Sequence, residues 1–407
     1  MLTTEQKSII KSTAPILKER GTEITSRFYQ QLFTSHPELL NLFNQTNQKK
    51  GRQQTALAGA VYAAAENIDQ LEDILPVVKQ IGHKHRSIGV RPEHYPIVGE
   101  HLLLAMKEVL GSDATDDVLE AWKEAYGVIA SVFIEVEEEM YQDASIQQGG
   151  WEGFKPFRVT HKVTESNAIT SFYLEPVDGN VLPSFSPGQY ISVQLQIEGE
   201  TYTHIRQYSL SDAPNQNYFR ISVKKESDHD PEGIVSNHLH ERVEVGDEIP
   251  VSAPAGDFVL STKDETPLVL ISGGVGLTPL LSMLKTVVHL QPERRVTFIH
   301  AARNSQLHAL KGEVTDLVKQ IETIQNYTIY SDPTEQDEQS VDTYTGHITL
   351  EWLQEILPHN QMEFYFCGPT GFMNAVYSAL QGWNVPEDRM HYEFFGPAKS
   401  LETINEG

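Results

Sequence analysis

The chain has 407 residues, 39% of them hydrophobic, and a formal net charge of −25. This length predicts about two to four domains, since a single hydrophobic core rarely serves so long a chain. The acidic surplus argues against nucleic acid or an anionic membrane as a partner, because both attract basic surfaces. The single cysteine, Cys367, excludes an internal disulfide framework and is typical of a reducing cytoplasm.

We expect neither a signal peptide nor a membrane span from the sequence. The first residues, Met1-Leu-Thr-Thr, lack the apolar core of a signal peptide. No apolar run approaches the roughly 18 residues that a transmembrane helix needs. We therefore expect a cytoplasmic protein with no membrane span, and we take a monomer as its oligomeric state.

Three segments of the chain differ in their hydrophobic period. Residues 1–147 follow helical spacing almost throughout, and Thr3 with Gln6 predicts a capping box for the first helix. Residues 151–262 hold short β-rich runs between turn residues, a pattern that predicts an antiparallel barrel. Residues 263–407 alternate strand-like and helical runs, which predicts an α/β domain with a parallel sheet. The expected strands are 157–163, 169–174, 190–195, 218–223, 268–272, 296–301, 327–330 and 364–367.

One histidine of the helical segment is expected to be buried. His85 shares an apolar stripe with Val78, Ile81 and Ile88, at steps of three and four, whereas His83 points nearly opposite, toward solvent. A buried imidazole is costly unless its nitrogens are satisfied. His85 is therefore either a metal ligand or a core histidine bonded to a backbone carbonyl.

Two polar side chains earlier in this segment have a similar ambiguity. Tyr29 follows Phe28 on an early helix, and Gln53 stands one turn before Leu57 on a later one. A phenol and an amide supply two donors to an otherwise apolar cavity, where they would stabilise a polar ligand on a metal. Alternatively, Tyr29 is a core aromatic whose hydroxyl reaches water.

The helical segment carries, in order, Phe28, Tyr29, Pro37, Phe43, Gln53, Leu57, Lys84, His85, Tyr95 and the run 122–128. With the features of the later segments, this order resembles the bacterial flavohaemoglobins over the whole chain. The resemblance implies a globin with haem b, in which His85 is the proximal iron ligand and Lys84 lies at the haem edge. It implies that Tyr95 and an acid on the last helix hold the imidazole. The implied distal pocket consists of Tyr29, Gln53 and Leu57.

Helical spacing selects the acid. Tyr126, Phe133 and Glu137 lie on one stripe, whereas Glu135 points away from it, so we choose Glu137. A carboxylate bonded to the second imidazole nitrogen would donate electron density to iron, which favours dioxygen activation over storage. Alternatively, Glu137 belongs to the solvated acidic run 137–139.

The barrel segment contains Arg206, Gln207, Tyr208 and Ser209 at the end of a β run. A guanidinium binds pyrophosphate through two parallel bonds, a tyrosine ring stacks on a flavin, and a serine hydroxyl bonds the reactive flavin nitrogen. Ser236 opens a later helix whose free amides favour phosphate, and it also fits an ordinary N-cap. These pieces resemble the ferredoxin-reductase-like flavin barrel, which implies that Tyr190 and residues 206–209 contact FAD.

A glycine-rich turn joins the strand 268–272 to the helical run 280–288. Its glycines permit close approach to a pyrophosphate, while Thr278 fits an N-cap and Pro279 the first helical position. A tight turn with no ligand fits the glycines equally well. The turn consists of Gly273, Gly274, Val275, Gly276, Leu277 and Thr278.

Later features complete the predicted NAD(P) site. Cys367 precedes a Gly-Pro turn that borders the nicotinamide by resemblance, and a buried structural thiol is the alternative. Arg303, after the strand 296–301, is either a ligand for the 2′-phosphate of NADPH or a surface arginine.

The acidic stretch 332–342 is expected to form a loop. The C-terminal run that resembles the family's flavin-covering tail, with Phe395 as the covering aromatic, is Glu393, Phe394, Phe395 and Gly396.

The predicted order of cofactors is a path for electrons. Nicotinamide delivers a hydride, flavin releases its electrons singly, and haem iron accepts one at a time. By the resemblance, NADH or NADPH reduces haem iron through FAD, and dioxygen on ferrous haem converts nitric oxide to nitrate. Two alternatives stay open: a general NAD(P)H reductase of dioxygen or ferric compounds, and an oxygen-binding sensor or store that its reductase keeps ferrous.

Overall fold

The computed structural model describes residues 2–43, 48, 50–214, 216–227, 232–340 and 343–396. Two parts of the predicted domain 263–407 lie outside the described residues, namely the residues beyond Gly396 and residues 341–342 of the predicted acidic loop. The chain divides into two compact units. The first holds most residues up to Phe154 together with Gln194–Arg206, and the second holds Lys155–Val193 and Gln207–Phe395.

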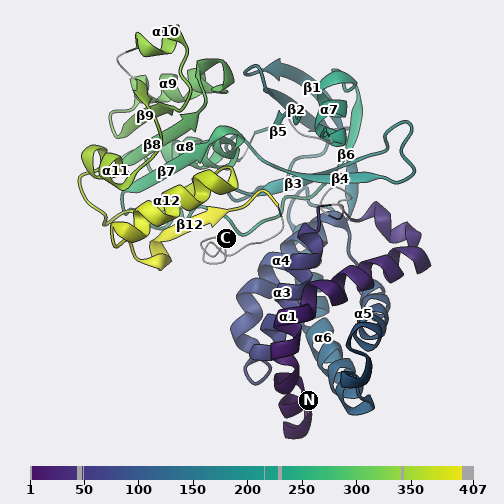
Figure 1. Ribbon diagram of the computed structural model, residues 1–407. Helices are drawn as coiled ribbons and strands as arrows, with labels where there is room; N and C mark the ends of the chain where they lie inside the picture. The colour runs from purple at the N-terminus through teal and green to yellow at the C-terminus, as the bar shows by residue number, and fades with distance from the viewer. Residues whose placement is uncertain are drawn as a thin grey trace. The chain divides into compact units, whose positions relative to one another are not determined.

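The first unit is helical, as the hydrophobic period predicts (Figure 1). The predicted capping box is present, since the Thr3 hydroxyl accepts from the Gln6 amide and the Gln6 side chain accepts from the Thr3 amide. Its core lies where α1 packs against α3, α5 and α6. The helices are α1 Thr4–Ser35, η1 Pro37–Asn41, α3 Arg52–Glu66, η2 Leu71–Ile74, α4 Leu75–Ile88, α5 His94–Leu110, η3 Gly111–Asp113 and α6 Asp116–Ile146.

Helices α5 and α6 approach each other closely at Gly99. A Cβ atom at this glycine would lie 2.4 Å from the Tyr126 ring, so the ring occupies the space that a larger residue would fill. The Tyr126 hydroxyl donates to the Tyr95 carbonyl at 2.6 Å, which ties the start of α5 to α6. No helix among the described residues is long and apolar enough to cross a bilayer.

A six-stranded sheet with the order β4-β3-β6-β1-β2-β5 follows. The β1–β2, β2–β5 and β3–β6 pairs are antiparallel, so the prediction of an antiparallel domain is confirmed. β6 had not been predicted, because its five residues lack a long apolar run. The elements are β1 Phe154–Thr164, β2 Ile169–Pro176, β3 Tyr190–Leu195, β4 His204–Ser209, β5 Phe219–Lys224, α7 Ile234–Glu241 and β6 Glu248–Ser252.

A second six-stranded sheet has the order β10-β9-β8-β7-β11-β12. Its neighbouring strands are parallel, as predicted. The strands are β7 Leu268–Gly273, β8 Val296–Ala302, β9 Ile324–Tyr330, β10 Thr343–Thr345, β11 Glu363–Cys367 and β12 Met390–Glu393. The helices are η4 Gly274–Gly276, α8 Leu277–Leu290, η5 Ser305–Leu307, α9 Lys311–Gln320, α10 Glu335–Glu338, α11 Leu350–Ile356, α12 Thr370–Gly382 and η6 Glu387–Arg389.

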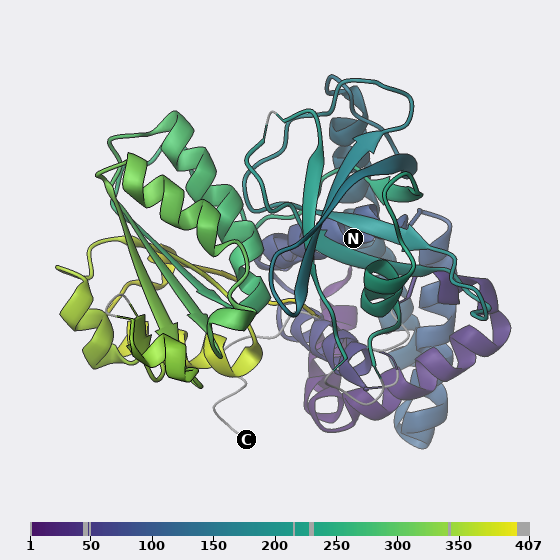
Figure 2. The ribbon, with the colours of Figure 1, turned by 90° about the horizontal axis from the view of Figure 1, so that it is seen from above.

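Helices cover both faces of this sheet, as Figure 2 shows. Leu268 and Leu270 of β7 pack with α8 and α9, whereas Val269 and Ile271 pack with α11 and α12. A central parallel strand is buried on both faces, which explains its unbroken apolar run. The first strand of the domain thus lies between β8 and β11, where the order of connection reverses.

Three local predictions for this domain are wrong. α8 begins at Leu277, so Thr278 lies inside the helix and Pro279 is its third residue rather than its first. The Thr278 hydroxyl donates to the Val275 carbonyl at 3.0 Å instead of capping. The acidic stretch predicted as a loop contains α10, which begins with a capping box between Thr334 and Asp337. Capping residues outweighed the high charge density there.

Candidate functional site

Three helices of the first unit bring their polar side chains together at Glu137. This carboxylate on α6 is only 3% exposed, and its Oε1 accepts from the Tyr95 hydroxyl of α5 at 2.6 Å. Nδ1 of His85, on α4, lies 2.7 Å from the same oxygen. Glu135 is exposed, so the acid that helical spacing selects is the one that meets the imidazole.

The Glu137 carboxylate determines the tautomer of His85. A carboxylate only accepts, so Nδ1 carries the proton and donates, which leaves the lone pair on Nε2. Burial and then the charge of Glu137 raise the pKa of Tyr95 above its usual value, so the phenol stays a donor. A metal-bound histidine uses the lone pair of one ring nitrogen and donates from the other to a carboxylate, carbonyl or water, so these residues fit a haem.

His83 differs from its prediction. It is half-buried, as is His85, and its Nδ1 atom is shielded from solvent, so the structure does not show the contrast in burial that helical spacing predicts for the two histidines. Lys84 is also half-buried. Its expected place at the haem edge stays a prediction.

Tyr29 lies in an aromatic cluster with Phe28, Phe33 and Phe43. Burial raises the pKa of Tyr29, and a hydrogen bond with Gln48 opposes that shift in part, so the hydroxyl stays protonated at neutral pH. It can therefore donate to a ligand, as the sequence predicts.

Gln48 is a site residue that sequence reasoning missed. Its Nε2 donates to Oε1 of Gln53 at 2.7 Å, so it connects the phenol of Tyr29 to the predicted distal amide. Leu57, one turn after Gln53, packs on the same core. No hydrophobic period marks Gln48 in its polar run, and its distance of five residues from Gln53 is the only sequence signal.

Strand β4 carries the predicted flavin residues Arg206, Gln207, Tyr208 and Ser209. Ser209 is buried, and the Gln207 amide donates to the Ser192 hydroxyl at 3.3 Å. Nη1 of Arg206 donates to the Ile205 carbonyl at 2.7 Å. The four residues therefore lie on one strand, as the sequence predicts, and their contacts with FAD stay predictions.

Two further barrel residues bear on the flavin prediction. The ring of Tyr190 lies 3.0 Å from where a Cβ atom at Gly256 would stand, and Gly256 has a φ of +116°. Because glycine has no side chain, Gly256 leaves room for the Tyr190 ring. Ser236 is inside α7, and its hydroxyl donates to the carbonyl of the true N-cap, Gly233, at 3.2 Å. The N-cap alternative for Ser236 is therefore wrong.

The glycine-rich turn and the Cys367 turn meet at the carboxyl edge of the parallel sheet. A Cβ atom at Gly276 would lie 2.1 Å from the Cys367 carbonyl oxygen. A Cβ atom at Gly273 would lie 2.8 Å from the Phe372 ring. β7 and β11 are paired neighbours, so the two turns border the crevice where open α/β sheets bind nucleotides. This backbone cradle fits a dinucleotide.

The Cys367 side chain is buried, and the place of this residue beside the nicotinamide stays a prediction. Its thiol is fully buried, and burial raises its pKa well above the usual value, with a further contribution from the charge of Glu393. The neutral thiol is a poor nucleophile. Arg303 follows directly after β8, and its contact with a 2′-phosphate stays a prediction.

The C-terminal run begins in the sheet and leaves it. Glu393 ends β12 opposite Cys367, and Phe394 packs against the sheet core. Phe395 is 47% exposed, so a large aromatic surface is open at the place where the family's tail is expected to cover a flavin. That role for Phe395, and any role for Gly396, stays a prediction.

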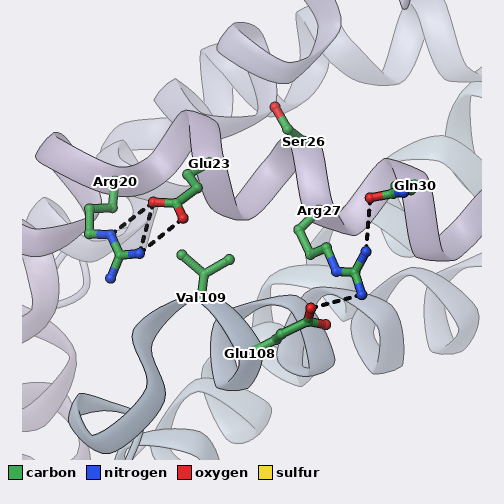
Figure 3. Close-up of a pocket in the computed structure, with 7 residues that line it drawn as sticks. All are labelled: Arg20, Glu23, Ser26, Arg27, Gln30, Glu108 and Val109. Carbon is green, nitrogen blue, oxygen red and sulfur yellow. Dashed lines mark hydrogen bonds and ion pairs between the residues drawn. The ribbon is translucent and has the colours of Figure 1, made fainter.

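A separate groove of the first unit contains none of the predicted site residues (Figure 3). Its arginines are already paired, Arg20 with Glu23 at 2.8 Å and Arg27 with Glu108 at 2.7 Å. Charges that are neutralised in this way have little left for an anionic ligand. The groove lining is Arg20, Glu23, Ser26, Arg27, Gln30, Glu108 and Val109.

Family models match each of the three predicted domains. A globin model matches residues 26–133, an oxidoreductase FAD-binding model residues 156–260 and an oxidoreductase NAD-binding model residues 270–378. The flavohemoprotein of Bacillus cereus is 59% identical over 404 residues, 99% of this chain and all of that protein. The chain belongs to the flavohemoprotein family. The exact boundaries of the three domains, at residues 1–147, 151–262 and 263–407, stay predictions.

Other flavohemoproteins show the same relationship. That of Bacillus subtilis is 52% identical over 98% of this chain and 99% of its own length. A flavohemoglobin from Malassezia yamatoensis, solved with bound FAD and heme, has a TM-score of 0.86 and 28% identity over 97% of this chain and 100% of its own. The chain is therefore an NAD(P)H-dependent oxidoreductase with haem, FAD and nicotinamide dinucleotide as cofactors.

The meeting of the two turns gives a direct test. Gly276→Ala should destabilise the protein by about 1–3 kcal/mol, because the new methyl group collides with backbone rather than with a movable side chain. It should also weaken NADH binding. Urea unfolding and the NADH dependence of flavin reduction measure both effects.

Gly371→Ala is the matched control, since a Cβ atom at Gly371 meets no atom within 4 Å. This variant should keep the wild-type NADH dependence and be at least as stable as the wild type, because alanine favours the helix in which Gly371 lies. Wild-type stability and NADH affinity in Gly276→Ala would show that the two turns do not abut as described.

Proposed function

We propose that this flavohemoprotein is a nitric oxide dioxygenase that uses NAD(P)H and dioxygen to convert nitric oxide to nitrate. The observation that carries the proposal is the buried Glu137 carboxylate, which bonds both His85 and Tyr95. Haem iron bound at His85 would supply dioxygen binding and one-electron chemistry. We further expect a cytoplasmic monomer.

On the proximal side, Glu137 holds the Nδ1 proton of His85 and makes Nε2 a stronger electron donor. This push favours reaction at bound dioxygen over reversible storage, for which a neutral backbone acceptor would suffice. Tyr95 holds the carboxylate in place, because its phenol donates to the same oxygen. The proximal side is thus built for electron donation.

On the distal side, the Tyr29 hydroxyl would donate to a ligand that carries partial negative charge. Gln48 and Gln53 hold a second donor group nearby through their mutual hydrogen bond. The aromatic cluster around Tyr29 excludes water, which strengthens these bonds. Such a pocket suits dioxygen and small diatomic partners.

A solved relative supports the choice of substrate. The flavohem-like FAD/NAD-binding domain of a nitric oxide dioxygenase from Vibrio cholerae is 40% identical, with a TM-score of 0.55, over 60% of this chain and 99% of that one. The similarity covers the reductase part of the present chain. It supports a reductase suited to nitric oxide dioxygenation.

His85→Ala should abolish haem binding, or leave the haem without its strong proximal ligand, while FAD stays bound. The reason is that only Nδ1 of His85 is engaged by Glu137 and Tyr95, so Nε2 is the group available to iron. Absorbance spectra of the purified variant measure both cofactors. An unchanged haem spectrum would assign the ligand elsewhere, with His83 the first residue to examine.

Tyr29→Phe should release dioxygen faster and turn over nitric oxide more slowly, because it removes only the donor hydroxyl. One charge-assisted hydrogen bond contributes about 1.5–3 kcal/mol, or roughly ten- to a hundred-fold in affinity. Stopped-flow dioxygen release and aerobic nitric oxide consumption measure the effect. Reduction of the flavin by NADH should be unchanged.

Tyr62→Phe is the matched control, since its hydroxyl lies near Glu66, at the opposite end of α3 from Gln53. It should behave as the wild type does. Wild-type dioxygen release and nitric oxide turnover in Tyr29→Phe would refute the distal role of Tyr29.

A further inference from the structure

The second unit contains a fully buried arginine that the flavin and nucleotide sites do not use. Arg220 of β5 has a side chain that is 1% exposed. Its Nε donates to the Ser211 hydroxyl at 3.1 Å, and Nη2 donates to the Ser211 carbonyl. A buried guanidinium is costly unless acids neutralise it. Its acids therefore matter for the position of this arginine.

One of those acids comes from the nucleotide-binding part of the chain. Both terminal nitrogens of Arg220 donate to the Glu313 carboxylate, in the first turn of α9. This two-pronged pair joins a strand of the antiparallel sheet to a helix of the parallel sheet. A planar fork of this kind fixes orientation as well as distance.

A second pair of charges extends the contact to α8. Nζ of Lys285 donates to Glu313 at 3.0 Å and also pairs with Asp212. Although burial opposes it, Arg220 and Lys285 hold the pKa of Asp212 below its usual value, so this carboxylate is charged. The Ser282 hydroxyl, one turn before Lys285, donates to the Asp212 carbonyl at 2.7 Å.

The positions of these residues in the chain show which segments the network connects. Asp212 follows three residues after Ser209, the end of the predicted flavin strand β4. α8, which carries Ser282 and Lys285, begins directly after Gly276 of the nucleotide turn. The network thus connects the segment after the flavin residues to the helix after the nucleotide residues. Any slip between the two parts must break the ion pair of the buried Arg220 with Glu313.

We propose that Arg220, Asp212, Lys285 and Glu313 are positioning residues that hold the glycine-rich nucleotide turn in register with the flavin strand for hydride transfer. None of them is among the predicted cofactor contacts, and they act through β4 and α8. Hydride transfer needs the donor carbon and the flavin nitrogen in close, aligned contact, and an error of about 1 Å can cost roughly a hundred-fold in rate. The inference rests on the NAD(P)H–FAD oxidoreductase activity and not on nitric oxide chemistry.

Glu313→Gln in the full-length protein tests the proposal, because it keeps the shape of the side chain and removes its charge. With FAD content at the wild-type level, the maximal rate of anaerobic flavin reduction by NADH should fall about ten- to a hundred-fold. The NADH concentration at half-maximal rate should change by less than about twofold, since the nucleotide turn itself is intact. This split distinguishes positioning from binding.

A spectroscopic readout is independent of turnover. NAD⁺ added to the chemically reduced flavoprotein gives a long-wavelength charge-transfer band when nicotinamide stacks on flavin, and Glu313→Gln should weaken that band. The double variant Glu313→Gln/Lys285→Gln should lose little more rate than the worse single variant, since both residues act in one network. Additive losses would contradict a shared network.

Asp316→Asn is the matched control, because it removes an exposed carboxylate from the same helix, whose ion-pair partner among the described residues is Lys319 at 3.8 Å. It should leave rate and band unchanged. The proposal is overturned if Glu313→Gln reduces its flavin at the wild-type rate, or if its loss of rate follows a loss of FAD or a global unfolding. The assay contains no nitric oxide, so its outcome is separate from that of the proposed dioxygenase activity.

Discussion

The charge of Glu137 is buried where three helices meet, and this constraint organises the haem side of the molecule. An isolated carboxylate would cost several kcal/mol to bury, so it requires donors, and the Tyr95 phenol and the His85 imidazole supply them. The same bonds leave Nε2 of His85 basic. The cost of burying the acid is thus offset by contacts that also prepare an electron-rich metal ligand, so stability and chemistry depend on one set of hydrogen bonds.

In the second unit, a buried charge also fixes the geometry, here between two sheets rather than between three helices. Two sheets with separate cores must present a flavin and a nicotinamide to each other, and apolar packing alone allows them to slide. Arg220 and Glu313 oppose sliding because a displaced pair would leave buried charges unsatisfied. Both units therefore use a buried, fully paired charge to fix geometry at a place where electrons must move.

Much of this could be predicted from sequence, where a period or a local motif carried the information. Helical spacing alone selected Glu137 over Glu135, and the glycine-rich turn after a buried strand was recognisable. Contacts between distant segments could not be predicted where neither a period nor the family resemblance marked them. The Gly276–Cys367 approach depends on strand order, and the Arg220 network joins four elements. The Thr278 and Ser236 cap predictions were wrong because Gly276 and Gly233 occupy the N-cap positions, which moves both hydroxyls inside their helices.

The central claim is that electrons from NAD(P)H are spent on turning nitric oxide and dioxygen into nitrate. Each nitrate formed from nitric oxide and dioxygen consumes one electron, and each NAD(P)H supplies two. The decisive measurement is nitrate formed per NAD(P)H oxidised during aerobic nitric oxide consumption by the purified holoprotein. The account predicts about two nitrates per NAD(P)H, sustained over many turnovers. NAD(P)H oxidation without matching nitrate, or a single burst of nitrate that stops after one equivalent of haem, would contradict it.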